Sequence, residues 1–288
     1  MTAMVNAMTV DVEDYFQVSA FESIIKKNQW ATHASRVENN TYACLDLFER
    51  NQVTATFFML GCVAEAAPGL VRDIVAQGHE LASHGYSHVR VIHQNQTEFR
   101  EDIRLTKKIL EDLSGIAVTG YRAASYSICA QTPWAYEELS NAGYHYSSSI
   151  YPIHHDLYGD PNAPRLPFAT PNGDLTEVPV TTARWVGKNW PAGGGGYFRL
   201  LPYWYSKTAI NAVNSKDKAP VVFYFHPWEI DPGQPRIADT PLKTRIRHYS
   251  NLEKMQPKLE QLTNQFTWSR LDALIDLGNS TFKPQPIA

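Results

Sequence analysis

Apolar runs rich in β-branched and aromatic residues alternate along this chain with segments whose apolar positions recur every three or four residues. The first pattern is typical of buried strands, and the second is typical of helices that cover a sheet. Strands are predicted at residues 8–12, 53–60, 80–83, 117–121, 144–148, 175–180 and 219–225. Helices are predicted at residues 36–50, 64–77, 97–113, 133–141 and 203–213. Gly78, Gly115 and Gly143 follow three of these helices, where a glycine commonly ends a helix.

Strands that alternate with helices indicate a parallel sheet in which a helix connects each strand to the next. About seven such units predict an α/β fold, a distorted or incomplete (β/α) barrel. A doubly wound open sheet is the structural alternative, but the chain has no glycine-rich nucleotide loop. Residues 1–288 are predicted to form one domain. Its barrel core covers about residues 6–230, and a C-terminal extension at about 231–282 contains a helix near 251–264.

Two segments interrupt the alternation of strands and helices, at residues 152–172 and 187–202. The second contains the run Gly193 to Gly196, which resembles a phosphate-binding loop. No Lys-Ser/Thr pair follows the glycines, so phosphate binding is disfavoured. We expect a flexible loop that contacts the substrate.

The composition limits the possible environments and partners. A chain of 288 residues with 43% hydrophobic residues can bury a large core, and it has no apolar run long enough to cross a membrane. No signal peptide is recognised at the N-terminus, which favours the cytoplasm. The three cysteines, Cys44, Cys62 and Cys129, are interpreted as buried thiols in a reducing compartment.

The charge of the chain disfavours some partners. A net charge of −3 argues against nucleic acid and anionic membranes and favours a neutral substrate. A short basic stretch at residues 243–248 is predicted to be ordinary exposed surface, and binding of a polyanionic glycan is the alternative.

The candidate chemistry begins where two predicted strands end. Asp11, Glu13 and Asp14 crowd the end of the first strand, and His84 and His88 lie four residues apart after the third. Crowded carboxylates raise one another's pKa unless a cation is present, and two imidazoles with one carboxylate form a set that binds divalent metals. Zinc is the expected metal, with cobalt, nickel, manganese or iron as alternatives. Alternation along a strand places Asp11 and Glu13 on one face, which favours Glu13 as the carboxylate ligand. Asp14 fits that role equally well if the strand has already ended.

Five segments, in their order along the chain, carry a resemblance to a known family. They are residues 9–16, 78–88, 120–126, 146–152 and 223–231. The chain resembles the polysaccharide deacetylases, the NodB-like enzymes of carbohydrate esterase family 4. It looks closest to the branch associated with exopolysaccharide and exosortase gene clusters. The resemblance implies a hydrolase that removes N-acetyl groups from amino sugars of a polysaccharide or its precursor, alongside exopolysaccharide biosynthesis machinery.

The resemblance also implies roles for individual residues. Asp11 is the general base, Arg122 orients it, and His226 is the general acid. His84 and His88 bind the metal, together with either Glu13 or Asp14. Ser147 stands where the family often has an aspartate, so the carboxylate that pairs with His226 is open among Glu177, Glu229 and Asp231.

Aromatic side chains make up 12% of the chain, and sugar rings stack on such side chains. The residues expected to contact substrate are Tyr126, Trp185, Tyr197 and Trp228. Two other functions stay open: an amidohydrolase of small cyclic amides or ureides on the same fold, and a non-catalytic glycan-binding protein.

Overall fold

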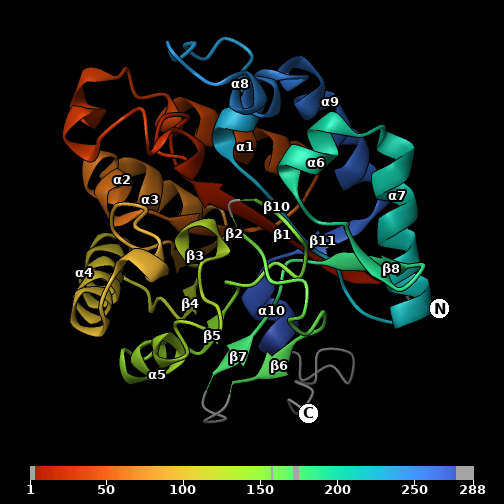
Figure 1. Cartoon of the computed structure of the whole chain (residues 1–288), viewed down its shortest axis with the longest axis horizontal. Helices are drawn as coiled ribbons and strands as arrows, with labels where there is room; N and C mark the ends of the chain where they lie inside the picture. Colours follow the sequence, from red (N-terminus) through yellow and green to blue (C-terminus); the bar gives the residue numbers. More distant parts are fainter. Residues whose placement is uncertain (1–3, 157, 171–174, 277–288) are drawn as a thin grey trace.

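The computed structural model describes residues 4–156, 158–170 and 175–276. Its main sheet has nine strands, eight of which lie in the order β10-β1-β2-β3-β4-β5-β7-β6. All neighbouring strands run parallel except β6 and β7. The strands are β1 Val5–Val12, β2 Thr56–Met59, β3 Glu80–Ser83, β4 Gly120–Tyr121, β5 Tyr146–Ser147, β6 Phe168–Ala169, β7 Thr176–Glu177, β10 Val222–Phe225 and β11 Thr267–Ser269. Figure 1 shows the sheet at the centre of the molecule, surrounded by helices.

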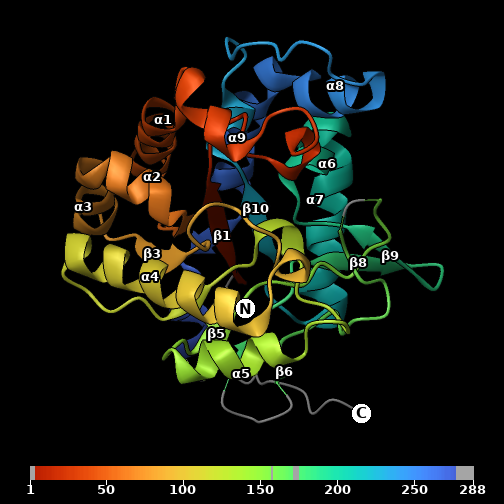
Figure 2. The same cartoon turned by 60° about the vertical axis from the view of Figure 1, so that its left-hand side comes forward.

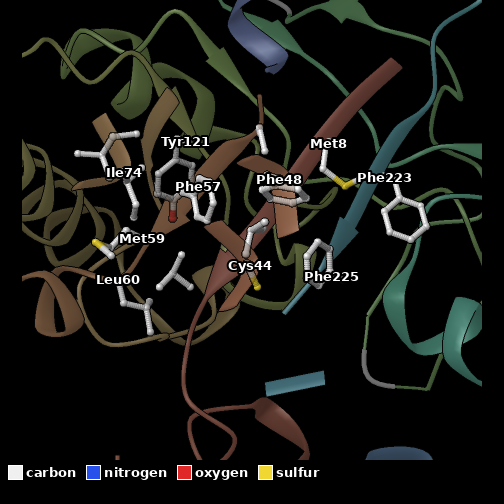
Figure 3. Packing of buried hydrophobic residues seen from close by; sticks show 14 of the residues in the cluster. Met8, Cys44, Phe48, Phe57, Met59, Leu60, Ile74, Tyr121, Phe223 and Phe225 are labelled. Carbon is white, nitrogen blue, oxygen red and sulfur yellow. The ribbon is translucent and has the colours of Figure 1, made fainter. Parts of the chain in front are cut away.

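The connecting helices lie outside the sheet, and apolar side chains fill the layer between them and the strands. Figure 3 shows part of this layer, where Phe48 of one helix meets Phe57 and Phe225 of two strands. The connecting helices are α1 Val37–Arg50, α2 Gly61–Ala66, α3 Pro68–Ala76, α4 Gln96–Ser114, α5 Trp134–Asn141, α6 Gly195–Leu200 and α7 Tyr203–Ala212. The alternating pattern in the sequence therefore predicted the architecture correctly: an incomplete (β/α) barrel.

The two open ends of the barrel are joined by an extended segment rather than by a strand. Val178 and Val180 donate backbone hydrogen bonds to Ser147 O and Ile150 O, at 2.7 and 2.9 Å. Next along the chain, Thr181 N donates to Val222 O of β10 at 3.3 Å. The segment between β7 and β8 therefore bonds to β5 on one side and to β10 on the other, and it helps to enclose the inner face of the sheet.

The residues 187–202 do not form the flexible loop expected from the sequence. β8 Thr182–Trp185 and β9 Lys188–Pro191 make an antiparallel hairpin, and α6 follows it. Figure 2 shows this hairpin beside α7. Gly193 lies so close to β10 that an added Cβ would be 2.1 Å from Val222 O. The glycines thus permit close packing on β10, a need that composition alone did not distinguish from flexibility.

The C-terminal part of the chain, the predicted extension, packs back onto the barrel. α8 Leu242–Tyr249 and α9 Leu252–Gln265 lead to β11, which pairs with the first half of β1. α10 Leu271–Asp276 then packs its apolar side chains against inward-facing residues of five segments: Ala7, Phe58, Ala82, Tyr146 and Val222. The lower end of the barrel interior is therefore filled. The end of the predicted extension, residues 277–282, lies outside the described residues.

Two expectations from composition can be compared with the structure. Within the described part of the chain, no helix has the length and apolar character needed to cross a membrane. The three cysteines are unpaired thiols, but only Cys44 is buried, and Cys62 and Cys129 are half-buried because both lie nearer the surface.

Candidate functional site

A cavity of about 130 Å³ opens at the carboxyl ends of the parallel strands. Strand alternation points Ala7, Thr9 and Asp11 to the barrel interior, and Glu13 continues the same row just beyond β1. β3 leads to His84, and β10 leads to His226. Because these strands are parallel, the residues at their ends lie around one cavity, which Asp11, Glu13, His84, His88 and His226 all line.

Glu13, His84 and His88 form the one group in the described residues that has the geometry of a metal site. One ligand atom from each lies within 4.8 Å of the others, and Glu13 Oε2 is 2.9 Å from His88 Nε2. Glu13 Oε2 is also buried, and it faces His88 Nε2 without the alignment of a hydrogen bond. A buried carboxylate oxygen that makes no aligned hydrogen bond is costly, and a cation held between the two residues would relieve that cost. The three residues therefore fit a divalent metal.

The surroundings of His84 and Glu13 favour the protonation states that metal ligands need. His84 Nδ1 lies 2.8 Å from the carbonyl oxygen of Arg122, which fixes the tautomer that leaves Nε2 free. Burial lowers the pKa of His84 to about 4, so this side chain is neutral at pH 7, as a metal ligand must be. Burial alone would raise the pKa of Glu13, but the charges of His88 and His226 outweigh it and lower the pKa to about 2.

Asp14, the other candidate ligand, points away from this group. Its Oδ2 accepts hydrogen bonds from Ser35 Oγ, Arg36 N and Val37 N at 2.8, 2.9 and 3.2 Å, and its Oδ1 accepts from Tyr15 N. The three donors to Oδ2 lie at the start of α1, where the first backbone N–H groups have no partner within the helix. Asp14 thus caps α1 from a distance in sequence.

Asp11 is held by a completely buried arginine. Arg122 Nη1 lies 2.5 Å from Asp11 Oδ1, and the same nitrogen donates to Thr9 Oγ1 at 2.8 Å. The rest of the guanidinium bonds to Ser148 O and Ser148 Oγ at 3.1 and 2.9 Å. Asp11 Oδ2 faces the cavity, with Tyr126 Oη at 3.3 Å and His226 Nε2 at 4.0 Å.

His226 is paired with Glu229 rather than with the other candidate carboxylates. Its Nδ1 lies 2.9 Å from Glu229 Oε1, and Arg199 Nε lies 3.1 Å from Glu229 Oε2. Glu177 instead accepts from the backbone N–H groups of Ser149 and Ile150. Asp231 is bound by Arg36 and Asn40.

The charge around His226 keeps it protonated. Burial lowers its pKa, but the negative charge of Glu13 and the hydrogen bond to Glu229 outweigh burial and raise the pKa to about 9. Trp228 stacks on the imidazole at 5.2 Å between ring centroids. His226 can therefore hold a proton on Nε2, which is 3.3 Å from Glu13 Oε1.

Gly195 makes room for the Glu229 carboxylate. A Cβ at this position would be 2.3 Å from Glu229 Oε1 and 2.8 Å from Phe225 Cβ. The glycine run singled out in the sequence thus serves the site indirectly, by letting α6 approach the carboxylate that holds His226.

Two of the four aromatic residues expected to bind sugar line the cavity. Tyr126 and Trp228 do, whereas Trp185 and Tyr197 do not. Trp185 packs edge-on against Tyr205 of α7, and Tyr197 packs against a buried aromatic cluster. α6 contributes Gly196 and Arg199 to the cavity, but it turns Tyr197 toward the aromatic cluster, so a substrate contact at Trp185 or Tyr197 stays a prediction.

Sequence reasoning missed several lining residues that come from separate segments. They are Tyr158, His155, Arg199, Tyr224, Arg247 and His248. A composition signal exists for two of them, because Arg247 and His248 belong to the basic stretch 243–248 that was interpreted as ordinary surface. Tyr224 lies within segment 223–231, which carries the family resemblance, and His155, Tyr158 and Arg199 belong to none of the five segments.

Comparison with protein families finds two consecutive matches, and residues 1–25, which include β1, lie before the first of them. Residues 26–147 match the family model described as "Polysaccharide deacetylase", and residues 148–276 match "Domain of unknown function (DUF3473)". The boundary falls inside the main sheet, and β10, from the second part, pairs with β1.

Several curated proteins are similar to part of this chain. A peptidoglycan-N-acetylglucosamine deacetylase of Bacillus cereus is 38% identical over 95 residues, which cover 33% of this chain and 34% of that protein. A chitooligosaccharide deacetylase of Bradyrhizobium is 29% identical over 87 residues, 30% of this chain and 40% of that protein. The matched region spans between about a third and two fifths of these relatives.

Solved structures share the fold over the whole chain. A protein from Mycobacterium smegmatis assigned as a polysaccharide deacetylase superposes with a TM-score of 0.63 at 18% identity, and the match covers 100% of this chain and 98% of that one. The peptidoglycan deacetylase PdaC of Bacillus subtilis gives a TM-score of 0.50 at 16% identity, covering 96% and 92%.

Proposed function

We propose that this chain, whose residues 26–147 match the polysaccharide deacetylase family, hydrolyses the N-acetyl group of an amino sugar in a polysaccharide. The observation that carries this proposal is the meeting, in one cavity, of a candidate metal-binding group, an arginine-held carboxylate and a protonated histidine. Hydrolysis of an amide needs an activated water and a proton for the departing amine, and these groups supply both.

Glu13, His84 and His88 would hold the metal, and zinc is the metal we propose. Bound there, it supplies Lewis acidity, which polarises an amide carbonyl and lowers the pKa of a water molecule. We assign no ligand role to Asp14, because its Oδ2 is bound at the start of α1 and its Oδ1 is bound by Tyr15 N.

Asp11 is the proposed general base. Arg122 occupies Asp11 Oδ1, which leaves Oδ2 as the oxygen that can take a proton from water in the cavity. Because Arg122 is buried and makes further bonds to Thr9 and Ser148, the carboxylate cannot rotate freely. Arg122 is thus a positioning residue that keeps the basic oxygen toward the substrate.

His226 is the proposed general acid. Glu229 holds Nδ1, so the proton on Nε2 faces the cavity and can pass to the nitrogen of the departing amine. The products would be acetate and a sugar with a free amine. Tyr126 and Trp228, which line the cavity, would contact the sugar. An exopolysaccharide or its precursor is the proposed natural substrate.

The test measures acetate release from N-acetylglucosamine oligomers and from exopolysaccharide. The proteins compared are the wild type, chelator-treated protein with and without added zinc, and the variants Asp11→Asn and His84→Ala. Activity that zinc restores and both variants lose would support the proposal. Opening of cyclic ureides without acetate release would replace it with an amidohydrolase. Glycan binding that survives Asp11→Asn, without hydrolysis of any of these compounds, would replace it with a binding function.

A further inference from the structure

A second, larger cleft lies outside the catalytic cavity. Its volume is about 1040 Å³, and it lies between the β8–β9 hairpin and the segment 153–168. Asn189 of the hairpin donates to the backbone oxygens of Pro152 and Pro161, at 3.0 and 3.4 Å. These bonds hold the two walls together, so the cleft is preformed.

The charges that line this cleft have one sign. Arg165, Arg184 and Lys188 line it, and no carboxylate does among the described residues. Arg165 is compensated by Asp217 at 2.6 Å and also bonds to Thr182 O. Arg184 and Lys188 are exposed, and no ion pair to either is found within residues 4–156, 158–170 and 175–276. A cleft whose walls carry one sign of charge concentrates the field and attracts the opposite sign.

One short stretch of chain lines both this cleft and the catalytic cavity. Ile153 and His154 line the cleft, and His155 and Tyr158 line the catalytic cavity. The two spaces are thus neighbours across a single segment.

On the catalytic side of that segment, one carboxylate is shared by two cations. Lys243 and Arg247 both bind Asp156, at 2.6 and 3.0 Å, so two cations share one carboxylate. Arg247 lines the catalytic cavity. Cations therefore flank the segment on both sides, although the chain as a whole has a net charge of −3.

We propose that the substrate is an acidic glycan, whose carboxylate-bearing sugars bind in the cleft at Arg184 and Lys188 while an N-acetylated sugar occupies the catalytic cavity. This inference rests on the proposed function for the identity of the second sugar. An acidic glycan replaces the neutral substrate that the net charge favoured, because the net charge averages over the whole surface and conceals a local excess of positive charge.

The test compares two soluble hexasaccharides of equal length. Hyaluronan hexasaccharide alternates N-acetylglucosamine with a carboxylate-bearing sugar, and chitohexaose has only N-acetylglucosamine. Affinities are measured by calorimetry at 4 °C for the wild type and for Arg184→Gln/Lys188→Gln. The variant Arg72→Gln/Lys254→Gln removes the same charge from two exposed helix positions and is the control. Acetate is measured in the same samples, so that failure of the proposed hydrolysis is seen separately from failure of binding.

We expect the wild type to bind the hyaluronan oligomer about tenfold more tightly than chitohexaose at low salt, and the cleft variant to lose that preference. The control variant keeps the preference, and high salt reduces it for every protein. Equal affinity for both sugars, or an unchanged preference in the cleft variant, would overturn the inference. A polyglutamate peptide of equal charge that binds the cleft as tightly as hyaluronan would also overturn it, because the site would then not recognise a glycan.

Discussion

Glu229 Oε1 lies 2.9 Å from Nδ1 of His226, three residues earlier in the chain, and Glu229 Oε2 lies 3.1 Å from Nε of Arg199. His226 and Glu229 are therefore close in sequence, and Arg199 of α6 binds the Glu229 carboxylate. Arg199 is itself bonded to the backbone oxygens of Arg247 and Ser250, so the C-terminal helices help to fix the orientation of His226.

Replacing Glu229 with glutamine should weaken catalysis and change its pH dependence. The negative charge of Glu229 helps to raise the pKa of His226, so Glu229→Gln lowers that pKa relative to wild type. If protonated His226 is the acid, the alkaline limb of kcat/KM moves to lower pH, and activity falls about 10- to 100-fold. Glu253→Gln, at an exposed position of α9, is the control. An alkaline limb that stays in place in Glu229→Gln would exclude this role.

Glu13 and Asp14 should respond differently to loss of charge. Glu13→Gln removes a proposed ligand, so the purified protein should contain little metal. Asp14→Asn should keep its metal but lower the free energy of unfolding by about 1–2 kcal/mol, because it weakens the bonds to the first residues of α1. Elemental analysis and urea unfolding measure the two effects. Loss of metal from Asp14→Asn with a stable fold would make Asp14 the ligand instead.

Gly195→Ala and Gly196→Ala form a matched pair. A Cβ at Gly195 would be 2.3 Å from Glu229 Oε1, whereas a Cβ at Gly196 has no atom within 4 Å. We expect Gly195→Ala to displace Glu229 and reduce acetate release at least about tenfold, without loss of metal. Gly196→Ala should keep most activity. Similar activities in the two variants would show that Glu229 tolerates displacement.

Glu177 should make stability depend on pH. Burial raises its pKa to about 7 from the ordinary value of 4.5, against the opposing effect of the N–H groups of Ser149 and Ile150. Its protonated form is thus favoured in the folded state. The contribution of protonated Glu177 to the free energy of unfolding is complete below pH 4.5 and is lost as pH rises through 7. The loss between pH 5 and pH 8 is on the order of 2 kcal/mol.

Urea unfolding at these two pH values compares wild type with Glu177→Gln, which cannot ionise. The stability of the variant relative to wild type should improve by a similar amount at the higher pH. A difference that is the same at both pH values would mean that Glu177 does not titrate in this range.

The sequence predicted well the parts of the molecule that depend on periodicity. Alternation along β1 placed Asp11 and Glu13 on one face, and the structure has both in the cavity. Glycines marked helix ends correctly, since Gly78, Gly115 and Gly143 all have positive φ. The predicted helix at 64–77 is divided at Ala67, because Pro68 begins a new helix.

Features that depend on distant contacts could not be predicted. Three carboxylates were possible partners for His226, and only the packing of α6 and β10 distinguishes Glu229 from Glu177 and Asp231. Asp14 could not be recognised as a cap, because α1 begins more than twenty residues later. The three-residue strand β11 is too short to show an alternating pattern.

The position of β11 also has a consequence for how the protein is made. Asn6 of β1 bonds to Thr267 of β11, 261 positions away in the sequence. During synthesis, the strand that leads to Asp11 leaves the ribosome early but lacks this neighbour until almost all the described chain has followed. Contacts between such distant positions form slowly. The first half of β1 is therefore expected to stay unpaired on this side until β11 has been synthesised. A product shortened before residue 267 should not complete its sheet and should not accumulate as a stable protein.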